Sequence, residues 1–233
     1  MPSPHPDHAT EARRFVRANL HGALSTLSRR LDGLPFGSVA PFAPDADGCP
    51  LLLISGLAEH TRNLQADPRC SLLAHPCAQD SQAAGRVTLA GRAVPLADAQ
   101  AGQRYLRLLP EAGRHLDLGD FSFWKIEPQV VRLISGFGGI HWVDAVDYRI
   151  DGRAVAAAED GLLDWLRHDP VLLRRLGAQG GAPHAVIDAV GVDPDGIDLR
   201  LDGHRLRLDF ASVALEPEAA RAAILALAGT QRR

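Results

Sequence analysis

A hydroxyl and a guanidinium stand side by side at Thr61 and Arg62, near the start of residues 58–66, whose pattern predicts a short helix. The first turn of a helix presents free backbone N–H groups, to which a Thr hydroxyl and a two-pronged Arg side chain add further donors. This combination suits a phosphate group. The same two residues also fit a capping Thr beside a solvated surface Arg, and their spacing alone favours that structural interpretation.

Other groupings of reactive residues are less informative. Cys70, His75 and Cys77 lie close together, but no second pair of ligands follows at the spacing of a zinc site. The glycine-rich run 136–139 lacks the third glycine and the strand-to-helix context of a dinucleotide-binding loop, and it suits a tight turn or a close backbone approach. No nucleophile elbow or zinc-protease motif occurs. We assign no catalytic residue, so a bound cofactor would have to carry any redox chemistry.

The composition is that of an ordinary globular protein, with 233 residues, 46% hydrophobic and 23% charged. A net charge of −3 without a basic tract gives no support for nucleic-acid binding. The three cysteines, an odd number, do not form the framework of a secreted disulfide-rich domain. We see no signal peptide and no apolar run of the roughly 18–20 residues that cross a membrane, so we expect a cytoplasmic protein without a membrane partner.

The elements that would position these residues are short strands interrupted by single helices, which favours an antiparallel barrel over a parallel sheet. Helices are expected at 9–23, 58–66 and 97–109, and strands at 24–28, 37–42, 51–55, 69–74, 85–96, 121–126 and 129–134, with an extended piece at 140–146.

The pattern changes near residue 150. Helices are expected at 153–167, 170–177 and 216–228, with a three-stranded meander at 184–192, 196–201 and 204–210. We therefore place a domain boundary near Tyr148, which separates a domain of residues 1–148 from a smaller one of residues 149–233. The fold class is α+β.

Four separated motifs, in this order, resemble the haem-utilisation (HugZ-type) branch of the pyridoxamine 5'-phosphate oxidase-like flavoproteins. They are LPFGSVAPF at 34–42, ISGLAEHTRNL at 54–64 followed by DPR at 67–69, RVTLAGRA at 86–93 and FGGIHWV at 137–143. The resemblance covers about residues 10–148, and the C-terminal segment resembles more weakly the small α/β domain often fused to that branch. It implies an antiparallel, six-stranded split β-barrel that forms a homodimer, with cofactor sites at the subunit interface.

The resemblance also implies which residues meet FMN. Its phosphate would lie against a hydroxyl, an Arg and a Lys, which match Thr61, Arg62 and Asn63 here. Asn63 therefore replaces the Lys, and Gly37 stands where a strand Arg is often found, so part of the phosphate charge lacks a partner. The full set implied to bind the cofactor is Ser38, Val39, Ser55, His60, Thr61, Arg62, Asn63 and Arg86. Ser38 is interpreted at least equally well as an ordinary strand residue of the barrel. Arg86 is interpreted better as an exposed Arg at a strand end than as a cofactor contact.

In the haem-utilisation branch the same barrel is associated with haem binding and oxidative haem breakdown. A neutral imidazole can hold haem iron, and His141 follows the glycine-rich loop close to the expected interface. His141 is therefore a candidate iron ligand and His60 a second histidine beside the phosphate segment, although a hydrogen-bonded or exposed histidine is the commoner case. The histidine motif often found in the C-terminal domain of the branch is absent from residues 166–170.

Three hypotheses follow. The first is an FMN-binding oxidoreductase, and the second a haem-binding and haem-degrading protein. The third is a non-catalytic haem-binding or regulatory dimer that has lost flavin binding. Family resemblance does not by itself establish activity, so whether the protein is an enzyme stays open.

Overall fold

The computed structural model describes residues 7–76, 84–135, 139–181 and 186–229. The chain divides into two compact units, Met1–Ile150 and Asp151–Arg233. Residues 136–138 of the glycine-rich loop and Cys77 lie outside the described residues.

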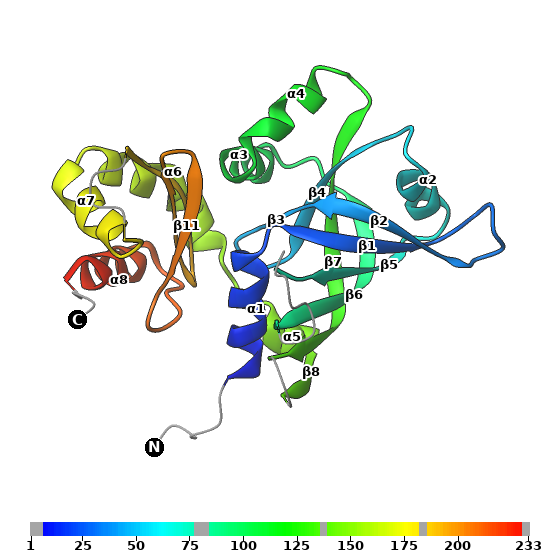
Figure 1. Ribbon diagram of the computed structural model, residues 1–233, viewed down its shortest axis with the longest axis horizontal. Coiled ribbons are helices and arrows are strands. Elements are labelled where there is room, and N and C mark those ends of the chain that lie inside the picture. The colour runs from blue at the N-terminus through cyan, green and yellow to red at the C-terminus, as the bar shows by residue number, and fades with distance from the viewer. Residues whose placement is uncertain (1–6, 77–83, 136–138, 182–185, 230–233) are drawn as a thin grey trace. The chain divides into compact units, whose positions relative to one another are not determined.

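The first unit is a curled antiparallel sheet of eight strands with helices around it (Figure 1). Along the sheet the strands follow the order β2-β1-β5-β6-β7-β4-β3, and β8 pairs with β7. The bounds are β1 (His21–Leu27), β2 (Pro35–Pro41), β3 (Ala43–Pro44), β4 (Pro50–Ser55), β5 (Arg69–Ala74), β6 (Arg86–Pro95), β7 (Phe121–Ile134) and β8 (Ile140–Asp144). The helices are α1 (His8–Ala18), α2 (Glu59–Ala66), α3 (Ala99–Leu108), α4 (Gly113–Leu116) and α5 (Ala145–Tyr148), with a 3₁₀ turn, η1, at Pro110–Ala112. The antiparallel split barrel predicted from the sequence is confirmed.

One face of this sheet forms the core. Leu24, Leu72, Leu89, Val131 and Val143 lie opposite one another on five neighbouring strands, and all are buried. Because successive side chains of a strand point to opposite faces, the row beside them points outward. We call this second surface the outer face. It includes the row Ala23, Leu73, Thr88, Arg132 and Trp142, whose members are partly or fully exposed.

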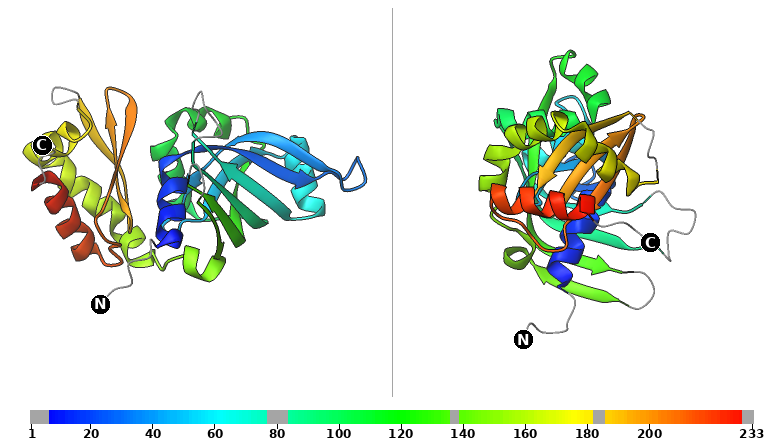
Figure 2. Two further views of the ribbon diagram at one scale, coloured as in Figure 1. Left: turned by 60° about the horizontal axis from the view of Figure 1, so that its bottom comes forward. Right: turned by 90° about the vertical axis from the view of Figure 1, so that its left-hand side faces the viewer.

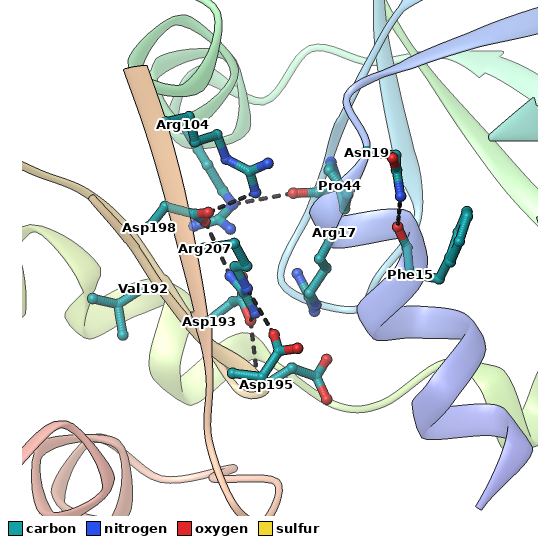
Figure 3. A network of polar contacts seen from close by, with 12 residues as sticks. Phe15, Arg17, Asn19, Pro44, Arg104, Val192, Asp193, Asp195, Asp198 and Arg207 are labelled. Atoms are coloured by element: carbon teal, nitrogen blue, oxygen red, sulfur yellow. Dashed lines mark hydrogen bonds and ion pairs between the residues drawn. The ribbon is translucent and has the colours of Figure 1, made fainter. Parts of the chain in front are cut away.

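Helix α1 closes the sheet at one end, and α2 lies at the other (Figure 1). Two buried arginines fix α1 to backbone carbonyls: Arg13 donates to Tyr148 O at 2.8 Å, and Arg17 donates to Asp45 O at 2.9 Å. The predicted helix over 9–23 is wrong at its end, because α1 stops at Ala18. Asn19 adopts an extended backbone there and donates its side-chain N–H to Phe15 O at 2.8 Å (Figure 3).

The two strands predicted at 121–126 and 129–134 are one continuous strand, β7. Pro128 cannot donate to a ladder and was expected to break the strand. Here it lies opposite Gly91, where the β6–β7 register shifts between Ala90 and Gly91. A bulge leaves a residue without ladder hydrogen bonds, so the proline is accommodated inside the strand.

The second unit is a three-stranded antiparallel meander with its helices packed on one face (Figure 2). Its elements are α6 (Arg153–Arg167), α7 (Pro170–Ala178), β9 (Ile187–Asp193), β10 (Gly196–Leu201), β11 (His204–Asp209) and α8 (Pro217–Gly229). Apolar side chains such as Ile197 and Leu208 form its core. Charged side chains occupy the other face, where Arg207 donates to Asp193 at 2.7 Å and to Asp198 at 3.0 Å (Figure 3). Within the described part of the chain, no helix has the length and apolar character needed to cross a membrane.

Candidate functional site

The first turn of α2 carries unpaired polar groups. Ala58 occupies the N-cap position and has no side-chain cap bond, so Thr61 is not the capping residue. The Thr61 side chain is buried, and its Oγ1 has no hydrogen-bond partner among the described residues. The Arg62 guanidinium makes no hydrogen bond or ion pair with any residue that the structure describes, and it is partly exposed. Both side chains are therefore available to a ligand or to water.

Asn63 serves a different purpose. Its side chain is fully buried, its Oδ1 accepts a hydrogen bond from Arg29 N at 3.1 Å, and its Nδ2 donates to Thr26 Oγ1 at 3.0 Å. The amide thus joins α2 to the end of β1. Because the amide is fully buried and both of its ends are held by protein groups, Asn63 supplies neither a cation nor an exposed donor to a bound phosphate.

Ser38 and His60 come together from different elements, as the predicted cofactor site requires. The hydroxyl oxygen of Ser38, on β2, lies 3.2 Å from His60 Nδ1. The His60 Nε2 is buried and has no partner among the described residues. Burial lowers the pKa of His60 below its usual 6.5, which keeps the imidazole neutral at physiological pH. Val39 points to the opposite side and is 82% exposed.

Ser55 shapes the turn between β4 and α2. Its hydroxyl donates to the Asp120 carboxylate and accepts a hydrogen bond from Leu57 N at 3.1 Å. The backbone of Gly56 is held as well, because its N–H donates to Asp120 O at 2.7 Å. Ser55 is thus positioned beside α2, where it fixes the loop that leads into the helix.

A hollow of about 430 Å³ lies beside the start of α2, lined by Ser28, Arg30, Leu31, Phe36 and Glu59. None of these residues was predicted as a site residue. The Asp32-Gly33 turn signal marks the tip of the β1–β2 hairpin, where both residues have positive φ angles. No signal in the sequence shows that this hairpin folds beside α2.

A second group of polar residues lies on the outer face. The Arg132 guanidinium stacks over the Trp142 ring, 5.1 Å from its centroid, and the Arg132 Nε is buried without a hydrogen-bond partner among the described residues. Arg86 lies diagonally across from Arg132, because Arg86 pairs with Ile134 in the ladder. The Arg86 side chain has no hydrogen bond or ion pair in the described part of the chain. Sequence reasoning selected Arg86 but missed Arg132.

His141 lies on the opposite face of the sheet from Arg86. It pairs with Leu133 and therefore points toward the core side, whereas Arg86 belongs to the row of Ile134. The His141 ring stacks on the ring of His8 at 3.5 Å between centroids, with 14° between their planes. The structure therefore does not bring these two predicted residues together in one site.

The two cysteines that the structure describes offer no nucleophile. Cys49 and Cys70 are free thiols, and burial raises the pKa of each to about 12. A thiol with such a pKa is protonated at neutral pH, so neither residue attacks a substrate or a disulfide.

The first unit resembles known proteins. Residues 3–149 match the family model "CREG, beta-barrel". A chloroplastic protein of Arabidopsis thaliana, named non-canonical heme oxygenase HOZ, is 46% identical over 129 residues, which are 54% of this chain and 40% of that protein. The chain therefore spans well under half the length of this relative.

Two solved structures resemble nearly the whole chain. The Agrobacterium tumefaciens protein Atu2129, of unknown function, has a TM-score of 0.80 and 25% identity over 96% of both chains. A heme binding protein from Mycobacterium smegmatis has a TM-score of 0.58 and 29% identity over 97% of this chain and 98% of the other. The family resemblance predicted from the four motifs is confirmed, and the chain belongs to the CREG β-barrel family of the FMN-binding-like split-barrel superfamily.

Proposed function

We propose that this protein binds haem on the outer face of its first unit, as a homodimer, and takes part in oxidative haem breakdown. The names of the Arabidopsis and Mycobacterium relatives support a role in haem chemistry. The proposal also includes a separate C-terminal domain of residues 149–233, as the sequence predicts, and a cytoplasmic location.

One observation carries the proposal: two guanidinium groups that have no hydrogen bond or ion pair among the described residues, Arg86 and Arg132, border an apolar surface. Haem is a flat apolar ring with two carboxylates at one edge, so a site for it needs apolar contact and cations together. Ile140 is 55% exposed and Trp142 is 66% exposed beside these arginines. Diagonal neighbours in an antiparallel sheet lie about 7–8 Å apart, which lets two guanidiniums serve two carboxylates of one ligand.

The residues of this chain would hold and orient the ring. Arg86 and Arg132 would each bind one carboxylate, and Trp142 would hold the Arg132 side chain in place by stacking. Bound haem would supply iron that reacts with dioxygen. His141, the iron ligand expected from the sequence, lies on the other face of the sheet and stacks on His8, so it would not reach haem held by Arg86 and Arg132.

A second copy of the chain would complete the site. Large apolar side chains are exposed around the β1–β2 hairpin and the β4–α2 turn, including Leu34 at 61%, Val39 at 82% and Leu57 at 69%. Exposed apolar groups of this size typically mark a protein contact. Dimerisation would cover them and exclude water from a ligand on the neighbouring outer face.

FMN is the second candidate, because Thr61 Oγ1 and His60 Nε2, near Arg62, are buried polar atoms without partners in the part of the chain that the structure describes. The donor set is nevertheless incomplete for a phosphate. Asn63 is occupied by Thr26 and Arg29, and the Glu59 carboxylate adds negative charge to the same turn. We therefore favour haem over FMN.

The test is to titrate the purified protein with haemin and, separately, with FMN, and to measure its visible absorption spectrum at each step. Saturable haemin binding should weaken about 10–100-fold in Arg132→Ala and in Arg86→Ala, because each loses a charge-assisted hydrogen bond. Arg92→Ala is the matched control on β6 and should bind like the wild type. Loss of the haem band with ascorbate and dioxygen would measure breakdown.

Several outcomes would change the assignment. FMN binding that depends on Arg62, without saturable haemin binding, would make the protein a flavoprotein. Haemin binding without breakdown would support the non-catalytic dimer. The haem band should be unchanged in His141→Ala, and a shifted band would place the iron on the core side of the sheet and overturn the outer-face site.

A further inference from the structure

The hollow beside α2 contains a carboxylate that lacks a partner. Glu59 lines the hollow, and its Oε1 is buried without a hydrogen-bond partner among the described residues. A shielded carboxylate oxygen without a donor is costly, because it has lost water and gained nothing in return. A cationic group in the hollow would remove that cost.

A guanidinium without a partner lines the same hollow. Arg30 forms no side-chain hydrogen bond or ion pair with the described residues, and it does not pair with Glu59 although both line one cavity. Opposite charges that share a cavity without touching leave room for a ligand that carries both. Leu31 and Phe36 supply apolar surface between them.

The turn that carries Arg30 is held in place by protein contacts. Asn63 of α2 accepts the Arg29 N–H, and Ser28 Oγ accepts the Arg30 N–H at 3.3 Å. The Gly33 N–H donates to Ser28 O at 2.9 Å, which closes the turn. Because α2 also carries Glu59, these contacts fix Arg30 and Glu59 on one rigid frame, and such preorganisation favours binding.

We propose that this hollow binds a small zwitterion with an apolar side group, such as an apolar amino acid. Its carboxylate meets Arg30, its ammonium meets Glu59, and its side group packs on Leu31 and Phe36. A volume of about 430 Å³ lies within the range of small-molecule sites. This site is separate from the outer face, so the proposal does not depend on haem binding.

Isothermal titration calorimetry with three probes tests it. L-phenylalanine carries both charges, phenethylamine only the cation and 3-phenylpropionate only the anion. The wild-type protein should bind L-phenylalanine saturably and bind each single-charge probe at least about tenfold more weakly, which is the effect of one lost charge-assisted hydrogen bond.

The variants give reciprocal expectations. Arg30→Gln should weaken L-phenylalanine binding by about tenfold or more and leave phenethylamine binding unchanged. Glu59→Gln should weaken L-phenylalanine binding similarly and leave 3-phenylpropionate binding unchanged. Arg29→Gln, on the same turn but outside the lining, should behave like the wild type, and thermal melting would verify that all variants fold.

The proposal is overturned if L-phenylalanine gives no saturable heat with the wild-type protein. It is also overturned if the three probes bind equally, or if Arg29→Gln loses binding as Arg30→Gln does. A change of oligomeric state in Arg30→Gln or Glu59→Gln, without wild-type binding of L-phenylalanine, would assign the two charges to a contact between copies of the chain.

Discussion

Asn63→Ala tests whether this residue is structural, as its contacts indicate, or part of a cofactor site, as the family resemblance implies. The substitution removes the acceptor of the Arg29 N–H and the donor to Thr26 Oγ1, at 3.1 and 3.0 Å. The side chain is fully buried, so solvent does not replace these bonds in the folded protein.

The magnitude follows from the two bonds. Each contributes about 0.5–1.5 kcal/mol, and a stranded buried group adds roughly 1–3 kcal/mol, so we expect a loss of about 2–4 kcal/mol in the free energy of unfolding. With a urea slope of about 2 kcal/mol/M, the unfolding midpoint should fall by about 1–2 M. The haemin affinity of the folded protein should stay unchanged.

Urea unfolding followed by circular dichroism measures the first quantity, and haemin titration the second. Arg62→Ala is the control, because its partly exposed side chain makes no hydrogen bond or ion pair with the described residues, and it should change stability by less than about 0.5 kcal/mol. A midpoint for Asn63→Ala within 0.3 M or so of the wild type would refute the structural role, given that slope. So would a loss of ligand binding at unchanged stability.

Three further predictions concern the first unit. Gly91→Ala should cost roughly 3 kcal/mol or more in urea unfolding, because a Cβ there would lie 2.0 Å from Glu127 O, whereas Gly37→Ala, with no atom within 4 Å, should be nearly neutral. His60 has a lowered pKa in the folded state, so the unfolded chain binds its proton more tightly, and stability should fall as pH drops below about 6.5. Urea midpoints measured from pH 7.5 to 5 should therefore fall less in His60→Gln than in the wild type. Equal pH slopes for the two proteins would contradict this. Tyr148→Phe removes a buried 2.7 Å hydrogen bond to a backbone carbonyl and should cost about 1–2 kcal/mol; an unchanged melting curve would show that the carbonyl needs no donor.

Strand alternation and turn chemistry were sufficient to predict most of the elements. Leu24 and Leu89 each stand between polar or small neighbours, which is the pattern of a sheet with one buried face. The failures occur where a local signal competes with tertiary structure. Pro128 predicts a break in isolation, and only the bulge opposite Gly91 explains why β7 continues.

The site was less predictable, because its residues come from elements that are distant in sequence. Ser38 and His60 were both selected from family resemblance, and the contact between them is visible only in the structure. Arg132 was missed because a single Arg in a strand has no distinctive pattern, and its stack on Trp142 depends on the β7–β8 register. That register also places His141 on the core side, which its sequence position does not reveal.

Residue 63 affects both the phosphate segment of α2 and the hollow beside it. A Lys there, as the family resemblance implies, has three donors and no acceptor, so it would leave the Arg29 N–H without its partner. Asn supplies that acceptor but carries no charge. Asn in place of Lys therefore removes one phosphate-binding cation from α2. Its amide oxygen also holds the turn that carries Arg30 beside Glu59. For this reason we expect that weak FMN binding and a preformed hollow at the hairpin both follow from Asn63.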